Sequence, residues 1–214
     1  MSRRLFDSRK SHGNVVFNFG HNPIEELCAF GAGYHEAGKT LVEKFEKLKG
    51  YSDYEGYPIF FLYRHSLELY LKSIAYKGAK LLNLMSDDSI AKDPKLLKSH
   101  GLTRYIPLLK KICLEREWGL TYKLDNGVSL DEAFQFIEEL ETIDSKSYTF
   151  RYPVNAKGEG SLGHHTVLNV IHFGKTLDPV LELLDGMITG IEHDWDNVAV
   201  ILYEVQQILR NNQD

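Results

Sequence analysis

A long apolar stretch, residues 57–77 with the sequence YPIFFLYRHSLELYLKSIAYK, constrains the fold more than any other segment. A proline stands near its start, and no glycine or further proline interrupts it, so one continuous helix is expected. A helix with so wide an apolar stripe should lie at the centre of a bundle and contact several neighbours. The residues that recur at helical spacing are Ile59, Phe60, Tyr63, Leu67, Tyr70, Leu71 and Ile74.

The charged groups of this stretch gather on one side of the predicted helix. At about 100° per residue, Arg64, His65, Glu68 and Lys72 fall within an arc of roughly 100°. One interpretation is a solvated edge whose i,i+4 ion pairs each stabilise the helix by about 0.2–0.5 kcal/mol. The other is a polar seam that faces a cleft or a partner. The helix alone favours the first, yet the crowding leads us to expect Arg64 and Glu68 to be buried and hydrogen-bonded.

Composition describes an ordinary globular protein of 214 residues, with 43% hydrophobic and 26% charged residues. The net charge of −5 argues against sequence-blind adhesion to nucleic acid, but it allows a local basic site. We find no apolar run long enough for a membrane span and no secretory signal. Cys28 and Cys113 lie on apolar helical faces, which is typical of buried, reduced thiols, so a cytoplasmic protein is expected.

The remaining segments predict further helices. Residues 1–21 read as an irregular arm, and a helix start at Asn22-Pro23 opens an amphipathic segment that runs to about residue 49. Small residues in that segment, Gly31, Gly33 and Gly38, would permit close approach of another helix.

The second half of the chain continues the helical pattern. Residues 102–117 form an apolar face in which Pro107 must kink the helix or lie in its first turn. Ser129 and Glu132 form a capping box ahead of the next helix. Two last helices are expected from about residue 176 and from Trp195, with a break near residues 193–196.

These segments predict one all-α domain over residues 22–214, an antiparallel bundle of about six helices. Short β-like runs flank a glycine-bearing loop, so a small β-hairpin near residues 147–173 is also allowed. His164-His165 invites a metal hypothesis, but no cysteine or carboxylate stands at a ligand spacing, and no metal or cofactor is expected.

Three stretches together resemble the HEPN superfamily, the higher eukaryote and prokaryote nucleotide-binding domains. They are FLYRHSLELYLKSI (61–74), SHGLTRYIPLLKKI (99–112) and FIEELETIDSKSYTFRYPVN (136–155). Glu68 and Lys72 match the family's E-x-x-x-K helix, and His100 with Leu102 matches its H-x-L helix start. The R-Y-P turn corresponds to residues 151–153, so the resemblance covers about residues 57–155 in the family's order.

The resemblance implies a helical, often dimeric protein, and many family members are metal-independent ribonucleases of toxin–antitoxin, phage-defence or RNA-processing systems. Their catalytic signature is an arginine followed by a histidine after four to six residues, and no arginine here has a histidine at that spacing. The chain is therefore more similar to members without the signature. An RNA- or nucleotide-binding protein with a degenerate site is expected, as a homodimer, with an antitoxin or a nucleotidyltransferase as a further partner.

Candidate site residues follow from the matched positions. Arg64 and Arg151 would contact phosphate together with Lys72, Glu68 would orient a basic neighbour, and Tyr152 would stack on a base. His65 and His100 would transfer protons or donate hydrogen bonds. Two alternatives stay open: a non-catalytic module whose charged seam meets a protein partner, and a non-standard nuclease site assembled from separate helices. In either case Arg64, His100 and Arg151 are expected to converge.

Overall fold

The computed structural model describes residues 15, 22–48, 53–85, 96–121, 123, 127–155, 157–162 and 167–211. Within these residues the protein is all-α and contains no β-strand, as predicted. The predicted N-terminal arm, residues 1–21, lies outside them apart from Val15. The α-helices are α1 (Leu27–Lys47), α2 (Gly56–Met85), α3 (Ile106–Glu115), α4 (Leu130–Ile143) and α5 (Val170–Asn211).

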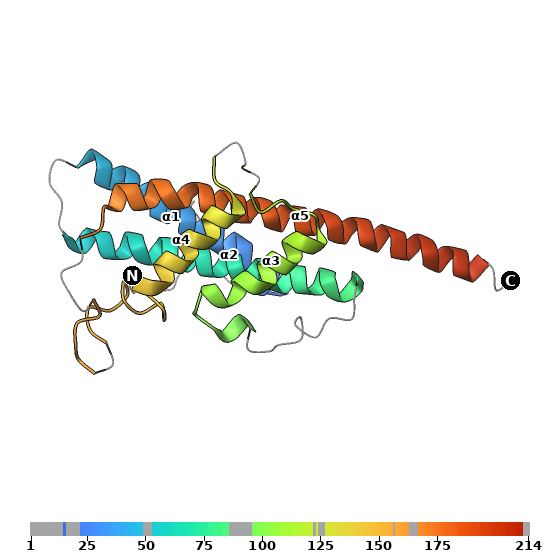
Figure 1. Ribbon diagram of the computed structural model, residues 1–214, viewed down its shortest axis with the longest axis horizontal. Helices are drawn as coiled ribbons and strands as arrows, with labels where there is room; N and C mark the ends of the chain where they lie inside the picture. Colours follow the sequence, from blue (N-terminus) through green and yellow to red (C-terminus); the bar gives the residue numbers. More distant parts are fainter. Residues whose placement is uncertain are drawn as a thin grey trace, which may run out of the picture.

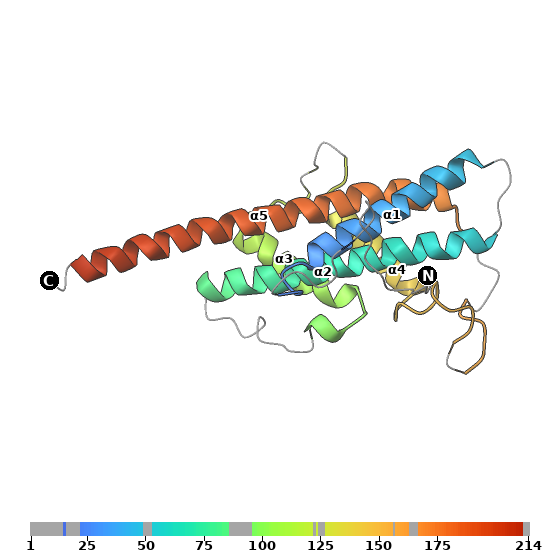
Figure 2. The ribbon, with the colours of Figure 1, turned by 180° about the vertical axis from the view of Figure 1, so that it is seen from behind.

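Helix α2 is the predicted central helix, and it contacts α1, α3 and α5. Together α2 and α5 form the middle of the bundle, with α3 and α4 on one side and α1 on the other (Figures 1 and 2). One hydrophobic core includes buried residues from all five of these helices. The prediction of a central position for this stretch is confirmed.

The helix directions differ from the simple antiparallel arrangement that was expected. Helix α1 runs antiparallel to α2, but α5 runs parallel to it (Figure 1). Near the start of both helices Phe60 packs on Phe173, and near the end of the bundle Lys77 pairs with Glu192. The long excursion through α3 and α4 brings the chain back to the start of α2 before α5 begins, which makes the parallel arrangement possible.

Helix α5 is continuous, so the predicted break near residues 193–196 is wrong. The polar residues that suggested the break lie on the surface of the continuous helix, and one of them pairs with another element. Asp194 Oδ1 lies 2.5 Å from Arg116 Nη2 at the end of α3. Pro179 also stands inside α5 without ending the helix. No described helix is both long and apolar enough to cross a membrane.

Local sequence signals locate the starts of α3 and α4. The Ser129–Glu132 capping box is present, because the Ser129 hydroxyl accepts from the Glu132 amide and the Glu132 carboxylate accepts from the Ser129 amide. Pro107 lies in the first turn of α3, after the 3-10 turn Thr103–Tyr105. At the start of the chain, a turn over residues 23–26 precedes α1, which begins later than predicted.

The allowed hairpin does not form within the described residues of 147–173. A single isolated bridge joins Val154 to Gly160, and the Asn155 side chain closes the turn by accepting from the amides of Lys157 and Glu159. Phe150 is buried against Phe60 instead of alternating along a strand. Packing against α2 therefore replaces cross-strand pairing.

Candidate functional site

The charged row on α2 is buried, as we expected from its crowding on an apolar helix. Arg64 is fully buried and Glu68 nearly so, and Arg64 Nη1 lies 3.1 Å from Glu68 Oε2. Lys72 Nζ lies 2.6 Å from Glu68 Oε1 and is also largely shielded from solvent. The interpretation as a solvated edge is therefore wrong for these three side chains.

Arg64 ties three parts of the chain together. Besides Glu68, its guanidinium donates to the His100 carbonyl at 2.5 Å and to the Asp144 carbonyl at 3.3 Å. The Asp144 carboxylate lies 3.8 Å from Arg64 Nε and is buried as well. A fully buried guanidinium engaged in this way is not exposed to a ligand, so the structure gives Arg64 a structural position rather than the predicted surface contact.

Glu68 is the hub of the buried polar groups. Burial alone would raise the pKa of its carboxyl. The hydrogen bond and charge of Lys72, the charge of Arg64 and the contact with His100 outweigh burial, so the pKa of Glu68 lies below its ordinary value. Glu68 is therefore ionised near neutral pH and accepts hydrogen bonds from all three partners.

His100 is the exposed end of this network. Its Nδ1 lies 2.9 Å from Glu68 Oε1, while 59% of its side chain is open to solvent. An ionised carboxylate can only accept, so Nδ1 carries the proton and Nε2 of the neutral ring is an acceptor. The arrangement orients an imidazole that can take a proton from, or hydrogen-bond to, a bound molecule.

His65 lies beside this network but is held by aromatic rings. Its ring stacks on Phe61 with centroids 5.5 Å apart and meets the edge of Tyr34 at 4.5 Å. Its Nδ1 is buried and has no hydrogen-bond partner among the described residues. Burial lowers the pKa of His65; the Glu68 charge opposes this shift, and the Arg151 charge adds to it. His65 is therefore neutral at physiological pH.

The loop after α4 presents Arg151 and two tyrosines. Asp144 Oδ1 accepts from the amides of Tyr148 and Thr149, which fixes the turn. The Arg151 guanidinium lies 5.0 Å from the centroid of the Phe61 ring, and the rings of Tyr148 and Tyr152 lie 5.3 Å apart. Arg151 and both tyrosines are exposed, and no described carboxylate pairs with Arg151.

Six of the seven predicted site residues divide into two layers, and His65 lies beside them. Arg64, Glu68 and Lys72 form a buried layer, which we call the ionic core. Exposed side chains form a rim over it, which we call the site rim. It comprises the predicted residues His100, Arg151 and Tyr152, together with Tyr148, which was not predicted.

The expected convergence is present in part. His100 touches the ionic core directly, through Arg64 and Glu68. Arg151 reaches the same side of α2 through the ring of Phe61, and it is close enough to His65 to influence that residue's pKa.

Several residues of the site escaped the sequence analysis. Asp144 was not singled out, although an aspartate after a helix end is a common turn former. Glu141 was not singled out either, and its Oε2 accepts from the Leu102 amide at 2.8 Å. Phe61 was given no role in the site, and the folded loop shows that its ring supports Arg151.

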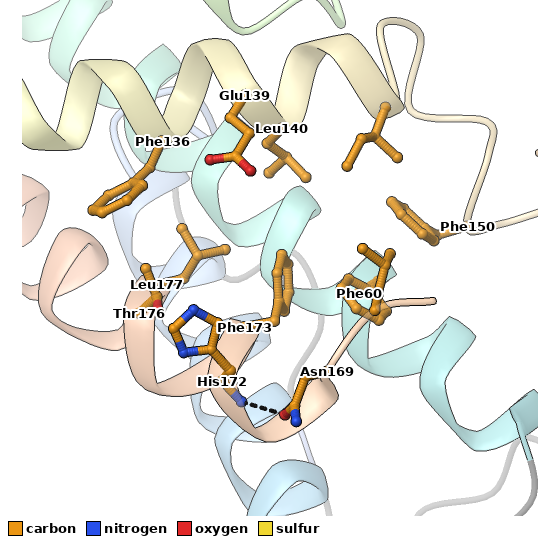
Figure 3. Close-up of a pocket in the computed structure, with 12 residues that line it drawn as sticks. Phe60, Phe136, Glu139, Leu140, Phe150, Asn169, His172, Phe173, Thr176 and Leu177 are labelled. Carbon is orange, nitrogen blue, oxygen red and sulfur yellow. Dashed lines mark hydrogen bonds between the residues drawn. The ribbon is translucent and has the colours of Figure 1, made fainter. Parts of the chain in front are cut away.

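A separate apolar pocket of about 180 Å³ lies between α4 and α5. Figure 3 shows Phe136 and Leu140 on one side and Phe173 and Leu177 on the other, with Phe60 and Phe150 at one end. Polar groups of Glu139, Asn169, His172 and Thr176 also line it. It contains none of the predicted site residues.

Metal ligands are not assembled in the described part of the chain. No group of three or more histidine, cysteine, aspartate or glutamate side chains there could hold a metal ion. His164 and His165 lie outside the described residues. Cys113 is buried and Cys28 is half-buried, and both are free thiols.

Comparison with known proteins does not extend this picture. The chain matches no protein-family model, no curated protein and no solved structure.

Proposed function

We propose that the protein binds a ribonucleotide, free or within single-stranded RNA, at the site rim. The observation that carries the proposal is Arg151, an exposed guanidinium with no described carboxylate partner, beside the exposed rings of Tyr148 and Tyr152. An arginine fork suits phosphate, and aromatic faces suit unstacked bases. Recognition of single-stranded RNA commonly combines these two contacts.

The ionic core positions the site rim and does not itself contact the ligand. Glu68 holds the His100 ring, and Arg64 fixes the His100 backbone and the start of the loop that carries Arg151. Both rim elements are therefore positioned by buried, charge-assisted hydrogen bonds, which are the stronger class. The resemblance to HEPN proteins agrees with a nucleotide ligand on this side of the central helix.

Cleavage of an RNA strand would require more catalytic groups than the matched residues of the site rim supply. His100 could act as a general base on a ribose hydroxyl. A cation must also stabilise the scissile phosphate. Arg64 is committed to Glu68 and two backbone carbonyls, and the exposed Arg151 lies over Phe61, close to His65. Binding is therefore the function that the geometry supports best.

Fluorescence anisotropy with a labelled single-stranded RNA and with a labelled mononucleotide tests the proposal. Tyr152→Leu should weaken RNA binding by about 1–3 kcal/mol, the usual contribution of one stacked base. Arg210→Ala, which removes an exposed arginine at the far end of α5, is the control and should leave affinity unchanged. Equal affinity for wild type and Tyr152→Leu would contradict stacking at the rim.

A protein-interaction role is the second candidate. The observation that favours it lies elsewhere, in the exposed apolar residues near the end of α5, among them Ile201 and Val205.

A further inference from the structure

The C-terminal part of α5 leaves the body of the bundle, by which we mean the region where α5 packs on the other helices. Trp195 is still covered by Lys80, whose Nζ lies 5.5 Å from the ring, and Val198 still packs against the core. Beyond that point the helix continues alone in both views (Figures 1 and 2). Residues 199–211 extend for roughly 20 Å at 1.5 Å per residue.

This projecting segment is too apolar for a helix surrounded by water. Residues 199–211, AVILYEVQQILRN, include only two charged side chains, Glu204 and Arg210. Solvated helices ordinarily carry a polar face and avoid contiguous exposed apolar patches. The exposed apolar residues here are Val200, Ile201, Tyr203, Val205 and Ile208.

The apolar positions continue a repeat that begins inside the bundle. The spacing alternates strictly between three and four residues, which is the seam of a coiled coil. Inside the body the first members of the seam are buried in the core, so the projecting part extends a surface that already packs on other helices. In the sequence the repeat comprises Leu184, Ile188, Ile191, Trp195, Val198, Leu202, Val205 and Leu209.

The residues that flank the seam on its two sides, which we call its borders, also allow two identical chains to pack together. Ile201 and Ile208 flank it on one side, and Ala199 and Gln206 flank it on the other. Neither border carries a charge, so two copies would not repel each other there. The segment is already helical as an extension of α5, so pairing does not require a new helix to nucleate.

We propose that residues 199–211 pair with the same segment of a second copy as an antiparallel two-stranded coiled coil. In an antiparallel pair each border faces its own counterpart, so Ile201 and Ile208 of one copy pack beside the same border of the other. A parallel pair would set these isoleucines against the border of Ala199 and Gln206. The helix dipoles also favour the antiparallel direction.

The association can be measured by sedimentation or light scattering over a concentration series of the full chain. Wild type should reach twice the 24.6 kDa monomer mass. Ile201→Glu should raise the dissociation constant at least about tenfold, because it buries a charge at the border where the two copies pack together. Val200→Glu is the matched control. Val200 is 57% exposed, the same as Ile201, but it lies on the helix face opposite the seam. Val200→Glu should therefore leave the dissociation constant within about twofold.

Both substituted positions lie outside the body, so both variants should keep the wild-type melting temperature at concentrations where all three proteins are monomeric. Small-angle scattering of the wild-type dimer should show an elongated particle with two bodies at opposite ends. A protein that stays monomeric at its highest soluble concentration would overturn the proposal. Equal weakening by Ile201→Glu and Val200→Glu, or a compact dimer with its bodies in contact, would also overturn it.

Discussion

Two arginines that the sequence treats alike have opposite positions in the fold. Arg64 is fully buried, and its guanidinium donates to Glu68 and to the carbonyls of His100 and Asp144. Arg151 is exposed and rests on the face of Phe61. The first guanidinium holds the site together, and the second is accessible to a ligand.

Arg64→Ala should strongly destabilise the protein. Removing the guanidinium leaves the buried Glu68 and Asp144 carboxylates without one of their cationic partners, and breaking a buried ion pair typically costs about 3–5 kcal/mol. Urea unfolding followed by circular dichroism would measure the loss. Arg210→Ala removes an exposed arginine and should change stability by less than about 0.5 kcal/mol. A loss below about 1 kcal/mol for Arg64→Ala would show that the ionic core does not hold the bundle.

His65 should make stability depend on pH. Burial, and to a smaller extent the Arg151 charge, lower the pKa of His65 in the folded state below its ordinary value of 6.5. As the pH falls below 6.5 the unfolded chain therefore binds this proton before the folded chain does, and the free energy of unfolding decreases. His65→Phe keeps the ring between Phe61 and Tyr34 and should remove this part of the decrease. Wild-type and variant stability curves that stay parallel between pH 7 and 5, two values that bracket about 6.5, would contradict the assignment.

A side-chain contact could be predicted from the residues alone where its two partners lie close together in the sequence. The Arg64–Glu68–Lys72 row could be predicted because i,i+4 neighbours on a helix necessarily meet. The approach of Arg64 to His100 was expected only through the family resemblance, and the contact of Arg64 with Asp144, which joins residues far apart in the chain, was revealed only by the folded structure. The same is true of the position of Arg151 over Phe61.

At the scale of elements, the pairing of α1 with α2 depends on small residues. A Cβ atom added to Gly38 would lie 2.9 Å from the ring of Tyr63, and one added to Gly31 would lie 3.2 Å from the ring of Tyr70. Tyr63 cannot easily move, because it is fully buried and its hydroxyl donates to Asp178 at 2.7 Å. The expected close approach is confirmed at these two glycines.

Gly38→Ala and Gly33→Ala should therefore have opposite effects. Gly38→Ala should destabilise the protein by about 1–3 kcal/mol, the usual range for overpacking, in spite of the better helix propensity of alanine. Gly33 lies on the same helix with nothing within 4 Å of an added Cβ, so Gly33→Ala should stabilise by about 0.4–1 kcal/mol. Thermal unfolding of both variants gives the comparison. Two changes of the same sign would mean that helix propensity, not the contact with Tyr63, dominates.

Helix existence could be read from the sequence more reliably than helix ends and directions. Apolar periodicity and the Ser129–Glu132 capping box locate α2 and α4 because these signals lie within the element itself. The expected break near residues 193–196 failed because the polar residues there lie on the surface of a continuous helix, where Asp194 pairs with Arg116. The parallel direction of α5 depends on the path of the chain through α3 and α4, which no local pattern encodes.

At the scale of the whole molecule, binding and association would use different parts of the structure. The site rim lies over the ionic core, where α2 meets the His100 segment and the loop after α4. The projecting part of α5 lies beyond the end of the bundle (Figure 1). Substitutions at Ile201 should therefore change association without changing the geometry around Arg151, so that the two proposals can fail independently.

The salt dependence of RNA binding tests the central claim, that Arg151 contacts a phosphate while the ionic core only supports it. For single strands the slope of log K against log salt changes by about 0.7 for each phosphate contact. Arg151→Ala should weaken binding and flatten this slope by about 0.7, with an unchanged melting temperature. An unaltered slope, a melting temperature that falls with the affinity, or no RNA binding by wild type at low salt would contradict the account.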